Sequence, residues 1–424
     1  MTGRPALPGA LTPAVGFPYL ARGDASMHVL FVHRTFPGQF GNIASHLAHL
    51  DGYRCTFISR DPPGSQNGIQ KVQYRQGDLP APRSFLSQDF DEGLSDAVGV
   101  YEALSDLGHS IQPDLIVGHG GWGSTLLLPE LYPDVPIIDY FEYFYRTRGS
   151  AIDFRTDWPA PDEYILRHRL QNAMIMLHLE YCTAGYTPSR FQHGLLPRPY
   201  GPKVRVIHDG IDTGFWRRTV DPIRAQSDTR IVTYVARGLE AMRGFDIFMR
   251  VAKRIYEAFP NVVFLVVGWD TVEYGHDLSL IPENSFKEHV LKQDDYDLER
   301  IRFLGPLPSE DLVRILSLSD LHIYLTVPFV VSWSLLNAMS CGCTVLASNT
   351  APVQEIVRHE QNGLLGEFFD VEGLAASALA VLRDPGRFRR LGSAAEETIR
   401  REYSLEVVMP RMTAFFHEVA ARAR

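Results

Sequence analysis

Two successive series of short apolar segments, each alternating with helix-like segments, constrain this chain more than any other feature. Such alternation is typical of parallel sheets whose strands are joined by crossover helices, so the fold class is predicted to be α/β. The expected strands are 28–34, 53–59, 113–119 and 135–141 in the first series, and 230–238, 261–269, 300–305, 320–326 and 343–349 in the second. Helical spacing of apolar residues also predicts a long amphipathic helix over 163–182.

The 424 residues suffice for two to four domains at roughly 100–200 residues each. We expect a flexible leader over 1–26, an N-terminal domain over 27–212, a C-terminal domain over 213–402 and a C-terminal helix over 403–424. Whether that helix returns to the first domain is left open. Two doubly wound domains joined by a linker form a cleft, and ligands bind at the carboxyl ends of the strands that face it.

Composition excludes several classes of protein. The net charge of −9 argues against a nucleic-acid partner. Four cysteines in so long a chain indicate free thiols in a reducing compartment, so a cytoplasmic location is expected. Residues 321–354 carry no Asp, Glu, Lys or Arg, but Pro328 and Gly342 interrupt the run, which predicts a buried strand-loop-helix-strand. No transmembrane segment is expected, and peripheral membrane contact is left open.

Two glycine-rich loops follow strands of the first series. In TFPGQFG, Gly38 and Gly41 would let the backbone approach a ligand at a helix N-terminus, although a tight connection without a ligand explains them equally well. His119 ends the strand PDLIVGH at the expected edge of the cleft. A histidine there can exchange a proton with, or donate a hydrogen bond to, a bound polar group. A purely structural histidine is the alternative.

Arginines and serines mark the second series. Arg237 ends a strand and Arg243 precedes a helix, where two guanidiniums suit a diphosphate; solvated loop arginines are the alternative. Loop amides before the helix that contains Ser332 and Ser334 are expected to cap an anion or sugar hydroxyls. The D-x-D pairs at 89–91 and 295–297 do not lie at strand ends, so no metal site is expected.

Together these segments resemble retaining glycosyltransferases of family 4, which have the GT-B fold of two Rossmann-like domains. The resemblance rests on VIHDGID, VARGLEAMRGFDIF, FLVVGWD, IRFLGPLP and residues 328–357, which occur in the family's order. HVLFVHRTFPGQF, IIDYFEYFYR and TPSRFQ resemble a bacterial branch with an N-terminal FPGQF signature. The match runs from about Met27 to the end of the chain.

The resemblance implies a nucleoside-diphosphate-sugar donor as co-substrate, with no metal ion or other cofactor. Arg237 and Arg243 match the residues that neutralise its diphosphate, and His119 matches a histidine facing the donor sugar. Gly38 matches the loop against the phosphates, and Leu304 falls where backbone contacts the nucleobase. The acceptor would be a hydroxyl of a glycan, a lipid-linked sugar or a small molecule, in polysaccharide or glycoconjugate biosynthesis.

The sequence departs from the family pattern at two positions. Phe329 and Asn337 stand where the family usually has two glutamates, the second of which binds the ribose hydroxyls. Asn337 still offers hydrogen bonds, without charge assistance. Glu355 is expected at a helix N-terminus and not as a replacement. These departures keep open a non-catalytic nucleotide-sugar or glycan-binding protein, and the shared fold keeps open an epimerase; a missing dinucleotide fingerprint disfavours a dehydrogenase.

Overall fold

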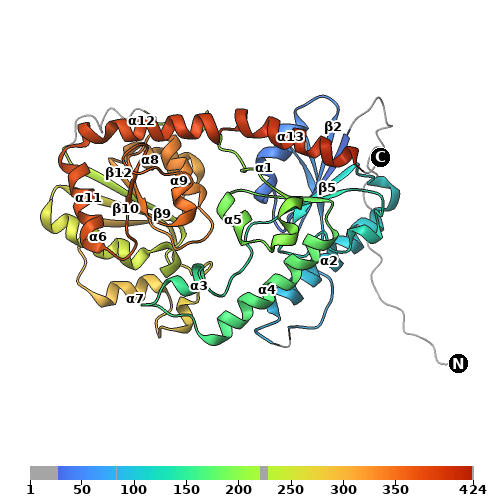
Figure 1. Ribbon diagram of the computed structural model, residues 1–424, viewed down its shortest axis with the longest axis horizontal. Helices are drawn as coiled ribbons and strands as arrows, with labels where there is room; N and C mark the ends of the chain where they lie inside the picture. Colours follow the sequence, from blue (N-terminus) through green and yellow to red (C-terminus); the bar gives the residue numbers. More distant parts are fainter. Residues whose placement is uncertain (1–26, 83, 220–227, 423–424) are drawn as a thin grey trace.

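The computed structural model describes residues 27–82, 84–219 and 228–422. The expected leader, 1–26, lies outside the described residues. Two parallel sheets with helices on both faces form two domains that lie side by side (Figure 1). This is the predicted α/β architecture of two doubly wound domains.

The N-terminal sheet has the strand order β3-β4-β2-β1-β5-β6-β7-β8 and is parallel except for the β3–β4 pair. Its strands are β1 (Met27–Val32), β2 (Tyr53–Ser59), β3 (Gly64–Gln66), β4 (Ile69–Gln73), β5 (Leu115–His119), β6 (Ile137–Tyr140), β7 (Ala184–Thr187) and β8 (Val204–Val206). The strand order reverses beside β1, which pairs with both β2 and β5. Ligands of doubly wound sheets bind at such a switch point, so the end of β5, His119, lies where a ligand is expected.

The C-terminal sheet has the order β11-β10-β9-β12-β13-β14 and all of its pairs are parallel. Its strands are β9 (Arg230–Gly238), β10 (Val262–Trp269), β11 (Ile301–Gly305), β12 (Leu321–Tyr324), β13 (Val345–Ser348) and β14 (Leu364–Gly366). Here β9 and β12 meet at the reversal of order. Arg237 lies near the end of β9 and Arg243 in the connection to the next helix, whereas Ser332 and Ser334 lie at the start of the helix that follows β12.

Helices cover both sheets. They are α1 (Gly41–Ala48), α2 (Gln88–Leu107), α3 (Ala151–Phe154), α4 (Asp162–Tyr181), α5 (Arg190–Leu195), α6 (Phe245–Ala258), α7 (Phe286–Gln293), α8 (Ser309–Leu318), α9 (Trp333–Ser340), α10 (Ala351–Gln354), α11 (Val371–Arg383), α12 (Pro385–Glu402) and α13 (Leu405–Ala421). Helix α6 shows why such segments fold as they do. Phe245, Phe248, Ala252 and Ile255 recur at helical spacing and are all buried.

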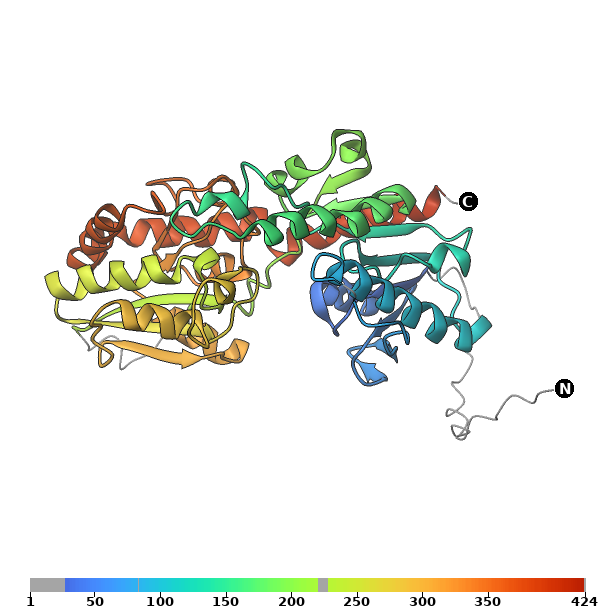
Figure 2. The same ribbon diagram turned by 90° about the horizontal axis from the view of Figure 1, so that it is seen from below.

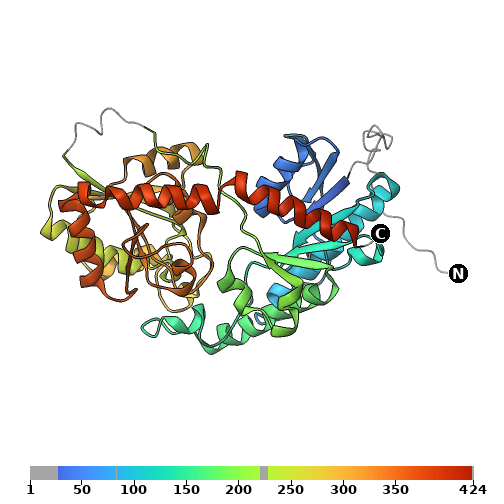
Figure 3. The same cartoon turned by 45° about the horizontal axis from the view of Figure 1, so that its top comes forward.

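Two segments cross from one domain to the other. Helices α12 and α13 run from the C-terminal to the N-terminal domain (Figures 1 and 3), and α13 packs on α1 and buries Met412 and Phe416 in the N-terminal core. In the other direction, the loop around α3 reaches the C-terminal domain (Figure 2). There Arg155 donates to both carboxylate oxygens of Asp246, in α6, at 2.9 and 2.8 Å. The domains are therefore tied by more than the linker.

The predicted central strands are confirmed, and β2 and β9 keep their predicted bounds. The charge-free run 321–354 forms β12, α9, β13 and the one-turn helix α10. No helix among the described residues is long and apolar enough to span a membrane. All four cysteines are buried and free.

Helix α4 corrects one prediction. It forms at the predicted place, but its buried residues all lie in its last three turns: Met174, Ile175, His178 and Leu179. Leu166 and Leu170, toward its start, are 53% and 44% exposed. The helix extends past the body of the N-terminal sheet, so only its C-terminal part has a core to face.

Candidate active site

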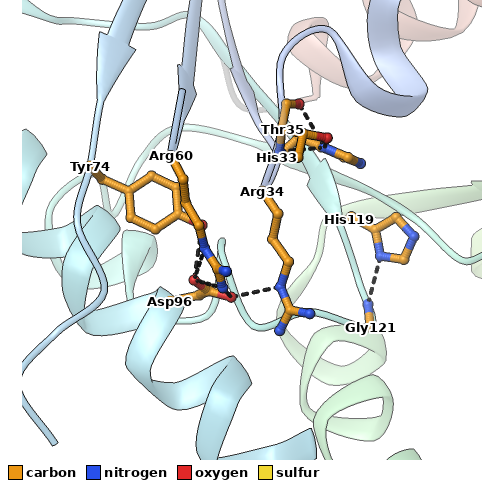
Figure 4. A network of polar contacts seen from close by, with 8 residues as sticks. All are labelled: His33, Arg34, Thr35, Arg60, Tyr74, Asp96, His119 and Gly121. Carbon is orange, nitrogen blue, oxygen red and sulfur yellow. Dashed lines mark hydrogen bonds and ion pairs between the residues drawn. The ribbon is translucent and has the colours of Figure 1, made fainter. Parts of the chain in front are cut away.

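His119 lies on the N-terminal edge of the cleft with one nitrogen held and the other free. Its Nδ1 accepts the N–H of Gly121 at 3.2 Å, so the neutral ring carries its proton on Nε2 (Figure 4). Nε2 is buried and has no hydrogen-bond partner among the described residues; the nearest carboxylate oxygen, Oε2 of Glu142, is 3.7 Å away. The ring stacks on Trp122 at 3.9 Å. An oriented N–H without a partner is suited to a polar ligand.

Gly38 serves the same edge in a way that the sequence did not reveal. Its φ is +48°, and a Cβ there would lie 2.2 Å from the ring of His33. The glycine therefore makes room for this buried ring, which packs at 4.6 Å against Trp122. Burial lowers the pKa of His33 to about 3, so this ring is neutral. Gly41 begins α1, close to Pro37.

Arg243 lies on the C-terminal edge and is almost fully buried, with 4% of its surface exposed. Nη1 donates to Oγ1 of Thr326 at 3.0 Å and to the carbonyl of Val330 at 2.9 Å. The rings of Tyr274 and Phe329 flank the guanidinium at 5.2 and 5.6 Å. These contacts fix a buried positive charge at the wall of the cleft, where a diphosphate would gain most from it.

Arg237 differs from Arg243 although it belongs to the same predicted pair. Its side chain is 66% exposed, and its Nε lies 2.8 Å from a carboxylate oxygen of Glu273. Two positive charges thus line the cavity: Arg243 is buried and held in place, and Arg237 is largely exposed to solvent.

The helix that follows β12 begins with a serine cap. The hydroxyl of Ser332 accepts the N–H of Ser334 at 3.2 Å, and the N–H of Ser332 donates to the Tyr324 hydroxyl at 2.8 Å. The hydroxyl of Ser334 donates to the carbonyl of Val235 at 3.1 Å. Ser332 is therefore at the cavity surface, whereas Ser334 holds α9 against β9.

A central cavity of about 490 Å³ brings both edges together. This volume is in the range of small-molecule sites. Arg237, Arg243 and Ser332 line it from the C-terminal domain, whereas His119 lines a smaller adjoining cavity of about 90 Å³. Glu142 lines both cavities. The other predicted residues, namely Gly38, Gly41, Leu304, Ser334 and Asn337, do not line these two cavities.

Leu304 and Asn337 lie outside the two cavities, in the interior of the C-terminal domain. Leu304 is partly buried against the core beneath α9, at the end of β11. Asn337 lies within α9 and is 7% exposed. The Asn337 side chain is thus buried about one turn into α9, three residues after Ser334.

Two cavity residues were missed as site residues by the sequence analysis. Glu142 comes two residues after β6, at the carboxyl end of a central strand, and this position was the available signal. Asp209 belongs to VIHDGID, to which no role was given. The side-chain amide of Gln39 donates to Asp209 at 2.6 Å, and burial raises the pKa of Asp209 to about 7. This contact connects the FPGQF loop, 36–40, to the segment around Asp209 that leads from the N-terminal to the C-terminal domain.

Glu355 corrects another expectation. It follows α10 instead of starting a helix, and its carboxylate accepts the backbone N–H groups of Arg190 and Phe191. These residues start α5 in the other domain, so Glu355 caps a helix N-terminus across the cleft. No group of three or more His, Cys, Asp or Glu residues among the described residues is placed to hold a metal ion.

Two family models match this chain, and the boundary between them falls between the two domains of the structure. Residues 51–215 match the model of the Glycosyl transferase family 4 group, and residues 218–398 match that of Glycosyl transferases group 1. The chain thus carries a family 4-type domain followed by a group 1 domain, as GT-B glycosyltransferases do.

Curated relatives are distant and only partly covered. The chain is 24% identical over 221 residues to an N-acetyl-alpha-D-glucosaminyl L-malate synthase of Bacillus anthracis, which covers 51% of this chain and 54% of that protein. It is 23% identical to a phosphatidyl-myo-inositol mannosyltransferase of Propionibacterium freudenreichii, over 61% of this chain and 67% of that one. The first of these matches spans about half of the relative's length.

Solved structures show the fold. A sucrose-phosphate synthase from Thermosynechococcus elongatus aligns with a TM-score of 0.71 at 18% identity, over 93% of this chain and 100% of that one. Anabaena HepE in complex with UDP-glucose aligns with a TM-score of 0.66 at 15% identity, over 92% and 100%. Both alignments include nearly the whole chain, so the GT-B fold extends over both domains.

Proposed function

We propose that this protein is a retaining glycosyltransferase that moves a sugar from a nucleoside-diphosphate-sugar donor to an acceptor hydroxyl without a metal ion. The observation that carries the proposal is the buried guanidinium of Arg243, held through Nη1, at a cavity that His119 approaches from the other domain. The HepE relative is described in complex with UDP-glucose, which supports a donor of this class. A cytoplasmic location is part of the proposal.

Each residue has a distinct part in the reaction. The bond between the anomeric carbon and the diphosphate breaks, and the acceptor oxygen bonds to that carbon on the same face while its proton passes to a leaving phosphate oxygen. Arg243 and Arg237 stabilise the growing charge on the diphosphate. His119 donates its Nε2 proton in a hydrogen bond to the sugar.

The second candidate is a nucleotide-sugar or glycan-binding protein without turnover. Asn337, in place of the usual glutamate, is the observation that favours it. Asn337 is buried within α9 and lines neither of the two cavities. We rank this candidate second because Arg243 and His119 line the two adjoining cavities.

A thermal-shift screen of the purified protein against UDP, GDP, ADP and dTDP and their common sugars, with and without a chelator, tests the proposal. A ligand at a hundred times its dissociation constant adds about 2.7 kcal/mol of stability. We expect a clear shift with one nucleotide that the chelator does not change. A shift that disappears with the chelator would overturn the metal-free site, and no shift with any nucleotide would overturn the donor assignment.

A further inference from the structure

We propose that the small cavity beside His119 is an acceptor site for a compound with an anionic group, a carboxylate or a phosphate, close to its reacting hydroxyl, and that Arg34 binds this group. The inference rests on the proposed function and specifies its substrate class. It starts from a polar network that the transfer reaction, as described above, does not use.

Arg34 follows β1 and is held by a buried carboxylate (Figure 4). Its Nε donates to Asp96 at 2.7 Å, and Asp96 is completely buried in α2. Because this bond uses Nε alone, the N–H groups of both terminal nitrogens remain for another partner. The guanidinium lies over the ring of Trp122 at 5.2 Å, and His119 stacks on the same ring.

The charges around Asp96 do not balance. Arg60 also binds this carboxylate, through Nε at 2.9 Å, and the hydroxyl of Tyr74 donates to it at 3.0 Å. Two guanidiniums therefore share one carboxylate, which leaves one positive charge in excess. Arg60 binds Asp96 through both Nε and Nη2, whereas Arg34 uses Nε alone and lines the cavity, so the charge that Asp96 does not neutralise is available there at Arg34.

The other charged groups of the cavity do not cancel Arg34. Asp89 is engaged by Arg167, which donates to both of its oxygens at 2.6 and 2.8 Å. Glu142 lies next to Nε2 of His119, with 3.7 Å between that nitrogen and Oε2. The cavity thus offers hydrogen-bond donors from Arg34 and a hydrogen-bond-accepting carboxylate from Glu142.

This polarity orients a ligand. An anion at Arg34 places a neighbouring hydroxyl toward Glu142 and His119, where the cavity adjoins the central one through Glu142. At about 90 Å³, the cavity is well below the roughly 300 Å³ at which drug-sized sites begin. It therefore suits a small acceptor or the small terminal group of a larger one. A neutral acceptor would bury the N–H groups of Arg34 without partners, at a cost in affinity.

Saturation-transfer NMR titrations with L-malate, glycerol 3-phosphate and neutral glycerol test the proposal on the full chain. We expect at least one of the two anionic probes to bind at least about tenfold more tightly than glycerol, since charged hydrogen bonds contribute about 1.5–3 kcal/mol. The Arg34→Gln variant should lose this preference, and Arg34→Lys should keep part of it. Comparison of the two anionic probes separates a carboxylate site from a phosphate site.

A matched control is Arg148→Gln, which removes an exposed arginine outside this cavity and should bind the probes as the unchanged protein does. Equal binding of glycerol and both anions, or unchanged anion binding by Arg34→Gln, would overturn the inference. Nucleotide binding is measured on the same samples. If a nucleotide binds normally while anions do not, only the acceptor inference fails; if no nucleotide binds, the proposed function fails.

Discussion

The two edges of the cleft are built in opposite ways. On the C-terminal edge the guanidinium of Arg243 is buried between two aromatic rings and is held through Nη1 by Thr326 and the Val330 carbonyl. On the N-terminal edge important polar groups lack protein partners: Nε2 of His119 is buried without one, and the terminal nitrogens of Arg34 are left over by its bond to Asp96. Buried polar groups without partners are rare in proteins.

The difference indicates which ligand binds at each edge of the cleft. A donor site made of fixed charges is organised before the nucleotide arrives, so little reorganisation is needed to stabilise the departing diphosphate. The other edge is completed only by the reacting groups. We therefore expect changes on the N-terminal edge to act on turnover and acceptor choice, and changes on the C-terminal edge to act on donor affinity.

The largest expected effect is that of His119→Ala. We expect kcat to fall about 100-fold, the size seen when one transition-state hydrogen-bond donor is removed, while the dissociation constant of the donor changes by less than about twofold. Steady-state kinetics and calorimetric titration measure the two quantities. His119→Asn, which keeps a donor near the same place, is the control and should recover part of the rate. An equal loss of affinity and rate would contradict the separation of the edges.

Arg243→Ala should weaken donor binding by about tenfold or more, because a buried charged hydrogen bond contributes about 1.5–3 kcal/mol. Arg243→Lys keeps the charge but not the planar group between Tyr274 and Phe329, so it should restore only part of the affinity. Calorimetric titration with the donor nucleotide measures both variants. Unchanged affinity in Arg243→Ala would remove this residue from the donor site.

Arg237→Ala should have a smaller effect, at most about fivefold in donor affinity, since exposed ion pairs contribute about 0.2–1 kcal/mol. The same titration measures it. This effect should shrink as salt is raised, whereas that of Arg243→Ala should persist, because salt screens exposed charges more than buried ones. A salt-independent loss as large as that of Arg243→Ala would show that the two arginines are equivalent.

The last prediction concerns stability and pH, not turnover or donor affinity, and is made for Asp209, which lines the central cavity. Burial raises its pKa to about 7, from an ordinary value of about 3.9 in the unfolded chain. Between these two pH values the folded protein holds a proton that the unfolded chain releases. The contribution of the Asp209 carboxyl to the free energy of unfolding therefore falls as pH rises from about 4 to about 7. The stability of Asp209→Asn relative to the unchanged protein should rise from about pH 4 to about pH 7.

Urea unfolding at several pH values measures this difference in the free energy of unfolding. The exposed Asp51 provides a matched control, since Asp51→Asn also removes one carboxylate, but from the surface. A pH-independent difference for Asp209→Asn would contradict the assignment of a buried, protonated carboxyl.

The C-terminal edge could be predicted from sequence because its residues are close together in the chain. Arg237 and Arg243 flank one strand-to-helix connection, and Ser332 and Ser334 start one helix. Local pattern and position at a strand end sufficed for Arg237, Arg243 and Ser332. They did not suffice for Leu304, Ser334 and Asn337, which do not line the two cavities. The difference in burial between Arg237 and Arg243 could not be predicted, because Arg243 is covered by Tyr274 and Phe329, which are distant in sequence.

The N-terminal edge could not be predicted in the same way. Arg34 follows β1, Asp96 lies in α2 and Glu142 follows β6. These elements are far apart in sequence and meet only when the sheet forms. Helix α2 was not singled out either, since it buries small residues such as Gly93 and Ala97. The edge strands β3 and β14 are three residues long and leave no clear period.

Release of nucleoside diphosphate tests the central claim, that this site turns over its donor, most directly. The donor sugar selected by the thermal-shift screen is incubated with the protein in excess chelator, with glycerol 3-phosphate, L-malate or water as acceptor, and the released nucleoside diphosphate is followed over time. We predict release that continues past one equivalent per protein and is lost in His119→Ala. A donor that binds tightly and stays intact with every acceptor would contradict the account and identify a binding protein.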